Sequence, residues 1–336
     1  MGEKKLLHKD NHNYYIDLFR FFLISWIVLF HYTIQYNSIV PDRSICLPVT
    51  FENGGVLGVS LFFMLSGYFM TKSLMTENYG LKEYLRYIVR RYLRLWFPYV
   101  FACIIIYIWI FFLPIARRTV DFTTLIANIA CIIHPGFDRV DNAHWFLADL
   151  LTVQLLLGLL LLVHNYRNRG VVLDIIFVLV MFAQIYPLPI LSGFTKELFE
   201  VLLGIQLFQM RKNKCTKTIV LSLIGFGVLL YTSVELFLFA VVFLSLTWLG
   251  KLIPLPPSPR QLKYALQFTG SVSFYWYLVH QNIGYSIMYY CIPSGTANEF
   301  WLLLPITITL LMSVVVYIIE NHISKSIFVR VRFLKQ

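Results

Sequence analysis

Long uncharged apolar segments recur along the whole chain and are separated by short polar stretches. Windows of about 17–25 mostly apolar residues predict ten membrane-spanning helices. They cover residues 16–36, 54–72, 97–115, 144–163, 171–187, 197–210, 217–232, 234–250, 268–290 and 300–320. Residues 122–134 are less apolar and are predicted as a re-entrant or interfacial helix. The pattern predicts an all-α integral membrane bundle of about ten helices, with residues 1–336 in a single domain.

The composition excludes a soluble domain. Of the 336 residues, 58% are hydrophobic and only 13% are charged. No small-residue cleavage site follows the first apolar segment, so we expect a retained helix rather than a signal peptide. The five cysteines form no CxxC pair, and no metal site is predicted.

The basic residues predict the orientation in the membrane. When the ten helices alternate, nearly all of the 28 basic residues fall on the side of the N-terminus. The exceptions are Arg43, Arg117, Arg118, Arg139 and Lys196. The positive-inside rule then places both termini in the cytoplasm, as in a multi-pass protein of the plasma (inner) membrane. The net charge of +11 is explained by this topology and by contact with the bilayer, not by nucleic acid binding.

The first apolar segment carries a charged and a titratable side chain. Arg20 and His31 are eleven residues apart, close to three helical turns, so both lie on one helix face about 16 Å apart. Ionisable groups within a spanning helix are costly and mark functional sites. A cation near one membrane face and an imidazole deeper in the bilayer indicate a long anionic ligand with a reactive end.

A second cationic feature precedes the third apolar segment. Arg86 and Arg90 share one helix face, and Arg91 and Arg94 share another. Arginine forks match phosphate oxygens, so this cluster is a candidate polyphosphate site. The alternative is a basic amphipathic helix lying on anionic lipid.

Two further polar residues fall at a similar depth to His31. His280 lies about 17 Å into the ninth segment, and Ser66 about 18 Å into the second. Gly67, beside Ser66, allows close approach of another backbone. These positions are candidates for the reacting centre, although a histidine or serine in a helix bundle also serves simple packing.

Taken together and in this order, these motifs resemble the acyltransferase-3 superfamily of membrane acyltransferases. The resemblance spans nearly the whole chain and rests on Ile16-Asp17-x-x-Arg20-x10-His31, Phe62-Phe63-x-x-Ser66-Gly67-Tyr68, Arg90-Arg91-x-x-Arg94-Leu95, His144-Trp145-Phe146-Leu147, Tyr277-Leu278-Val279-His280 and Glu320. No SGNH-type hydrolase segment follows the last span, so we expect the single-domain form.

The resemblance implies a ten-helix bundle that moves an acyl group, usually acetyl, from cytoplasmic acyl-CoA to a hydroxyl of an extracytoplasmic glycan or glycolipid. It implies that Arg20 and His31 match the family's essential pair, and Arg91 and Arg94 its CoA-contacting motif. Acetyl-CoA is then a co-substrate, with no tightly bound cofactor and no metal.

A mechanism follows from these assignments. His31 is the best candidate for the general base, because imidazole titrates near physiological pH. Direct transfer and an acyl-enzyme on His31 or Ser66 both stay open. The candidate catalytic residues are Asp17, Arg20, His31, Ser66 and His280, and the candidate acyl-CoA-binding residues are Arg90, Arg91 and Arg94.

Other classes of protein fit part of this pattern. A polytopic transporter of a small anionic or sugar substrate also has many spans and buried charges. A membrane-bound O-acyltransferase of the other major fold would depend on His280 rather than His31. A receptor or assembly factor would bind acyl-CoA without turnover. The acceptor and the acyl group, acetyl or succinyl, stay open, and the outer loops at 37–53 and 116–143 are expected to shape acceptor access.

Overall fold

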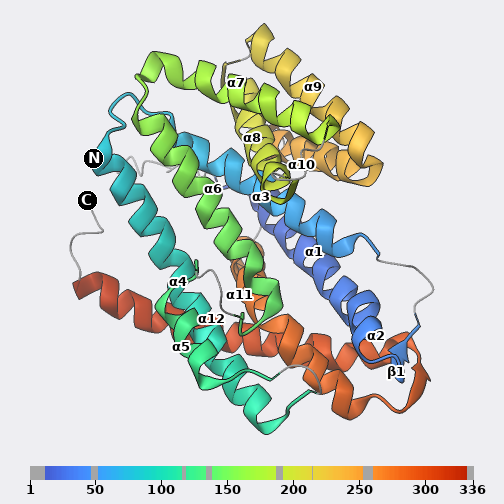
Figure 1. The fold of residues 1–336 in the computed structure, drawn as a ribbon. Coiled ribbons are helices and arrows are strands. Elements are labelled where there is room, and N and C mark those ends of the chain that lie inside the picture. Colours follow the sequence, from blue (N-terminus) through green and yellow to red (C-terminus); the bar gives the residue numbers. More distant parts are fainter. Residues whose placement is uncertain are drawn as a thin grey trace, which may run out of the picture.

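The computed structural model describes residues 12–46, 52–115, 119–133, 138–186, 192–213, 215–252 and 260–330. The helices, including a π-helical turn (η1) and two short 3-10 turns (η2, η3), and the strands are α1 (Tyr14–Phe30), η1 (His31–Gln35), α2 (Tyr36–Ile39), β1 (Arg43–Ile45), α3 (Gly54–Leu74), α4 (Leu81–Phe112), α5 (Phe122–Ala130), η2 (Asn142–His144), α6 (Trp145–Leu162), α7 (Tyr166–Ile185), α8 (Ser192–Asn213), α9 (Thr216–Thr232), α10 (Val234–Leu252), α11 (Arg260–Cys291), β2 (Gly295–Ala297), η3 (Glu299–Leu302) and α12 (Leu303–Arg330). Figure 1 shows these helices as one bundle.

Each of the ten predicted apolar segments falls on a helix, so the all-α membrane class is confirmed. Among the described residues, six helices are long and apolar enough to cross a membrane. They are 14–39, 54–74, 81–112, 142–162, 168–185 and 299–323, with two shorter apolar helices at 216–232 and 234–248. The ten crossings and the cytoplasmic termini stay predictions. Several residues used for the orientation, including Arg117 and Arg118, lie outside the described residues.

The third predicted span belongs to a longer helix than the apolar window indicated. Helix α4 begins at Leu81, so the arginine cluster and the apolar segment form one rod of 32 residues. At 1.5 Å per residue the rod is about 48 Å long, which exceeds the hydrocarbon thickness of a bilayer. The apolar window missed its start because arginine is a good helix former but not an apolar residue.

Small residues bring α3 and α8 into close contact. A Cβ at Gly67 would overlap the carbonyl group of Val201, and a Cβ at Gly204 would overlap that of Met64. The predicted close approach at Gly67 is therefore present, and α8 is the partner. Helix α1 packs between α3 and α11, which places the first apolar segment in the centre of the bundle.

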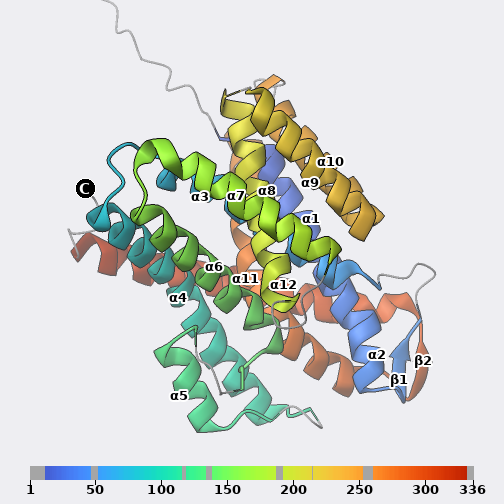
Figure 2. The same cartoon turned by 45° about the horizontal axis from the view of Figure 1, so that its top comes forward.

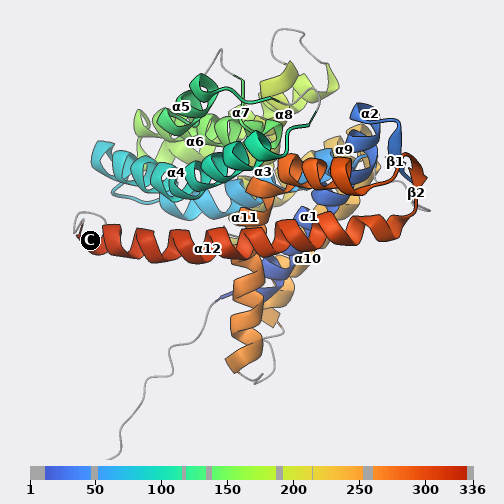
Figure 3. The same ribbon diagram turned by 90° about the horizontal axis from the view of Figure 1, so that it is seen from below.

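The remaining helices enclose this centre. Helices α7, α8, α9 and α10 pack on one another at one end of the bundle, away from α5 and from strands β1 and β2 (Figure 2). Helix α12 runs along α11, which changes direction along its length (Figure 3). Strands β1 and β2 form a short parallel pair, and Arg43 donates hydrogen bonds to the carbonyls of Tyr289 and Ile292 near the end of α11.

Candidate active site

A cavity of about 1370 Å³ opens between α1, α3, α4, α6 and α11. Its lining contains five arginines and two carboxylates, so the charge balance favours an anion. The arginines, which we call the basic cluster, are Arg20, Arg86, Arg90, Arg91 and Arg94, and the carboxylates are Asp17 and Glu83.

One arginine of the basic cluster is held from a neighbouring helix. Arg91 Nε donates a hydrogen bond of 3.0 Å to Gln154 Oε1 on α6. Among the described residues, Arg86, Arg91 and Arg94 form no ion pair with a carboxylate. Their charge is therefore available to a ligand. Pro98, which also lines the cavity, has no N–H for the carbonyl of Arg94 one turn earlier.

Asp17 and Arg20 lie together where α1 begins. Arg20 Nη1 is 3.8 Å from Asp17 Oδ1, and the guanidinium carbon is 5.3 Å from the centre of the Phe69 ring. Asp17 also pairs with His12, and a Cβ at Gly270 on α11 would overlap the Asp17 side chain. Asp17 thus holds the start of α1 against α11 and fixes Arg20 beside the cavity.

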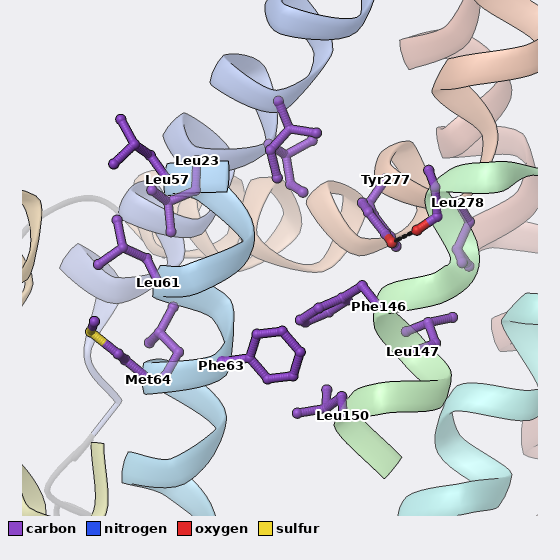
Figure 4. Close-up of a cluster of buried hydrophobic side chains, with 14 of the residues drawn as sticks. Leu23, Leu57, Leu61, Phe63, Met64, Phe146, Leu147, Leu150, Tyr277 and Leu278 are labelled. Atoms are coloured by element: carbon purple, nitrogen blue, oxygen red, sulfur yellow. Dashed lines mark hydrogen bonds between the residues drawn. The ribbon is translucent and has the colours of Figure 1, made fainter. Parts of the chain in front are cut away.

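Three aromatic residues line the end of the cavity away from the basic cluster. They are Phe62, Phe146 and Tyr277, and we call them the aromatic wall. The Phe146 ring lies 6.2 Å from Phe62 and 5.8 Å from Tyr277, centre to centre. Figure 4 shows Phe146 reaching from α6 between Phe63 and Tyr277, whose hydroxyl donates to the carbonyl of Ala143. On α1 the lining ends at Ile27, one turn before His31.

His31 lies beyond this wall in a second polar group, the histidine cluster, made of His31, Gln35, His280, Gln281 and Tyr285. The rings of His31 and His280 are 5.0 Å apart, centre to centre. His31 is the first residue of η1, a π-helical turn. Such turns are rare and recur at functional sites.

The segment 140–144 holds the part of α11 that carries His280. His144 Nε2 donates to the carbonyl of Leu278 at 2.8 Å, and Asn282 N–H donates to Asp141 Oδ2 at 3.0 Å. These two backbone groups are four residues apart, the spacing of a normal helical hydrogen bond. A side chain that inserts into this ladder bends a helix, which agrees with the change of direction in α11 (Figure 3).

The hydrogen bonds of His280 define its tautomer. Nδ1 donates to the carbonyl of Tyr277 at 2.7 Å, so Nε2 carries the lone pair. The side chain is fully buried, and Nε2 has no hydrogen-bond partner among the described residues. In its neutral form His280 can therefore accept a proton at Nε2, and it offers no N–H donor at that nitrogen.

The structure divides the predicted site residues into two groups. Asp17, Arg20, Ser66, Arg90, Arg91 and Arg94 line the cavity, whereas His31 and His280 lie outside its lining. The sequence grouped Ser66 with the histidines by depth, but Ser66 is on the cavity side of the wall. It also placed the arginines on two helix faces, yet Arg86, Arg90, Arg91 and Arg94 all line the same cavity.

Several residues of the site were missed by sequence reasoning. Gln35 and Tyr285, which contact His31, were not singled out. His144 appeared only as part of a motif, and neither its contact with α11 nor that of Asp141 was predicted. Gln35 lies four positions after His31, and this helical spacing is the signal that could have found it. The contacts between segment 140–144 and α11 have no local signal.

The apolar helices define a multi-pass membrane protein, and its bundle holds a cavity lined by five arginines. Residues 13–320 match the family model described as "Acyltransferase domain". The chain therefore belongs to the acyltransferase-3 family of membrane acyltransferases. No curated protein and no solved structure matches it.

Proposed function

We propose that the protein transfers an acyl group, acetyl in the first instance, from cytoplasmic acyl-CoA to a hydroxyl of an extracytoplasmic or lipid-linked glycan. The observation that supports this best is the cavity with the basic cluster at one end and the aromatic wall at the other, one helical turn short of His31. Acyl-CoA has a matching distribution of charge along its length. Its phosphates are at one end, and a long neutral arm carries the reactive thioester at the other.

In this proposal the basic cluster binds the phosphates of CoA. Arginine forks suit phosphate oxygens, and Gln154 fixes the guanidinium of Arg91 in advance. Arg20, which Asp17 holds beside the cavity, adds charge where α1 enters the membrane. The pantetheine arm then extends toward the apolar end of the cavity.

The acyl transfer itself takes place at His31. The acceptor hydroxyl gives its proton to the imidazole as its oxygen attacks the thioester carbonyl. The new C–O bond forms, the C–S bond breaks, and the proton passes to the departing CoA sulfur. His31 is not part of the cavity lining, whereas Phe62, Phe146 and Tyr277 are. In this proposal the aromatic wall therefore moves when acyl-CoA is bound, so that the thioester reaches His31.

The location proposed for this reaction is the plasma membrane, with the basic cluster on the cytoplasmic side. Acyl-CoA is made in the cytoplasm, and the excess of basic residues near this end agrees with that side. The glycan acceptor enters from the opposite side, where Arg43 and segment 138–144 contact α11 and Asp42 contacts Gly295 of β2.

The experiment uses the full chain in lipid nanodiscs with labelled acetyl-CoA and candidate glycan acceptors. Arg91→Ala combined with Arg94→Ala should raise the KM for acetyl-CoA at least tenfold and change the KM for the acceptor little. Arg211→Ala is the matched control, because Arg211 donates to the Tyr68 hydroxyl and does not line the cavity.

Three outcomes would count against the proposal. A change in acceptor dependence alone would refute the binding of CoA phosphates by the basic cluster. Substrate flux into proteoliposomes without consumption of acetyl-CoA would favour a transporter. Tight binding of acetyl-CoA with no transfer to any acceptor would favour a receptor or assembly factor.

A further inference from the structure

The side-chain oxygen of Gln35 collects three hydrogen-bonding groups. It contacts His31 Nδ1, accepts from Gln281 Nε2 at 2.8 Å, and accepts from the Tyr285 hydroxyl at 2.9 Å. Gln35 and His31 lie on η1, and Gln281 and Tyr285 lie on α11. One carboxamide therefore joins the histidine to the helix across from it.

The direction of these bonds is set by a backbone group. Ala143 N–H donates to Gln281 Oε1 at 2.9 Å, and a backbone N–H can only donate. This bond identifies the oxygen of the Gln281 amide, so the other end of that amide, Nε2, is a donor. The donor points at Gln35, which must therefore present its oxygen and not its NH2 group.

The π-helical turn keeps Gln35 beside His31. An α-helix has 3.6 residues per turn, and a π turn is wider. Residues four apart are therefore closer to eclipsed in η1 than in an α-helix. The local backbone thus places both side chains toward α11.

We infer that Gln35 is a positioning residue that fixes the tautomer of His31, with the proton on Nδ1 and with Nε2 as the basic nitrogen. The tautomer of a histidine is set by the bond that its other nitrogen makes. Gln281 Nε2 also lies 3.0 Å from His31 Nδ1. If Nδ1 were the acceptor, its lone pair would oppose the carboxamide oxygen of Gln35, which is its nearest partner. Nδ1 therefore carries the hydrogen.

This inference rests on the proposed role of His31 as a proton acceptor and makes that role more specific. Among the described residues, His280 and Tyr285 of α11 are titratable groups that face His31, and Asp141 accepts from Asn282 N–H on the same stretch of α11. The neutral Gln35 orients the ring without adding a charge.

The test combines a structural and a kinetic measurement on the full chain in nanodiscs. Nitrogen NMR on ¹⁵N-histidine-labelled protein reports the tautomer, and the His31 signals are identified by their loss in His31→Gln. We expect the proton on Nδ1 in the unsubstituted protein and a mixture of tautomers in Gln35→Ala. Gln35→Ala should lower kcat about 10- to 100-fold with little change in the KM for acyl-CoA.

Gln35→Glu supplies a second, opposite test. The carboxylate keeps the Nδ1–H hydrogen bond and also stabilises the imidazolium, so the acidic limb of the kcat–pH profile should move to higher pH. Asn37→Asp is the matched control. It introduces the same charge two residues away, where the side chain bonds both backbone groups of Ile45 and not His31.

The inference is overturned if His31 carries its proton on Nε2 in the unsubstituted protein, or if Gln35→Glu and Asn37→Asp move the acidic limb equally. A protein with the expected tautomer but no acyl transfer would refute the proposed function and leave the tautomer assignment standing. Retained size-exclusion profiles and melting temperatures separate these effects from misfolding.

Discussion

His31 and His280 come from opposite ends of the chain, yet their rings lie 5.0 Å apart in the centre of the bundle. Helix α1 brings one ring and α11 brings the other, and Tyr32 on the first segment donates to the carbonyl of His280 at 2.7 Å. The two rings differ in surroundings, because His280 is fully buried and His31 is half-buried. This difference favours His31 as the ring that meets substrate.

The first prediction separates the two histidines. His31→Gln should lower kcat by about 10²–10⁴-fold, because it removes the general base, with unchanged binding of acyl-CoA. His280→Gln should cause a smaller loss. His164→Gln is the control, since the His164 ring donates to the carbonyl of Leu160 near the end of α6 and belongs to neither the cavity lining nor the histidine cluster. Kinetics with labelled acetyl-CoA provide the measurement. The reverse order of losses would favour the other major fold of membrane O-acyltransferases.

The second prediction concerns the aromatic wall. Phe146→Leu should connect the cavity to the histidine cluster and let water reach the thioester, so that release of free CoA without acceptor rises several-fold. Phe63→Leu is the matched control, because Phe63 packs on Phe146 at 4.7 Å but does not line the cavity. A thiol assay measures the release. Equal rates in the two variants would show that Phe146 does not separate the two sites.

The third prediction tests the packing of α3 on α8. Gly67→Ala should destabilise the bundle by about 1–3 kcal/mol or more, because the added carbon would overlap the backbone of Val201. Gly227→Ala on α9 is the control: a Cβ there meets nothing within 4 Å, and alanine favours a helix by about 0.5–1 kcal/mol. Thermal unfolding in detergent measures both. A stable Gly67→Ala variant would contradict the close approach of the two helices.

The fourth prediction concerns a buried arginine far from the wall. Arg169 is 3% exposed and donates to four backbone carbonyls, those of Leu161, His164, Thr76 and Tyr79. Arg169→Ala should lower the free energy of unfolding by about 3 kcal/mol or more, since the carbonyls lose their donors. Arg169→Lys should lose less stability than Arg169→Ala but more than none, because an ammonium lacks the planar fork of donors that reaches several carbonyls. Chemical denaturation checks this order, and full rescue by lysine would contradict it.

The sequence predicted the helical bundle because apolar segments of sufficient length are a local signal. It also found Arg20, Arg91 and Arg94, since charged residues next to apolar runs stand out. It could not show that these arginines and Ser66 line one cavity, because that depends on how α1, α3, α4 and α6 pack. The sequence gives only the depth of a residue along its own helix. On that basis Ser66 was grouped with His31 and His280, although Ser66 lines the cavity and the two histidines do not.

The contacts that hold His31 and α11 in place were the hardest to predict. Ala143 and Gln281 are far apart in sequence, and nothing near either indicates that they are hydrogen-bonded. The π-helical turn at His31 also has no signature in the pattern of apolar residues. Both features arise from tertiary packing around α11 rather than from local preference.

The wide turn at His31 has a consequence for the end of the bundle that carries β1 and β2. Each added residue rotates the rest of a helix by about 100°, so η1 decides which way Tyr36 and Asn37 point. Tyr36 is fully buried, and Asn37 bonds both backbone groups of Ile45 in β1. A single-residue deletion within 31–35 would therefore both misalign His31 with α11 and break the bonds that hold Asn37 to strand β1. The His31 ring and the strand pair share one helical register, so neither can change without the other.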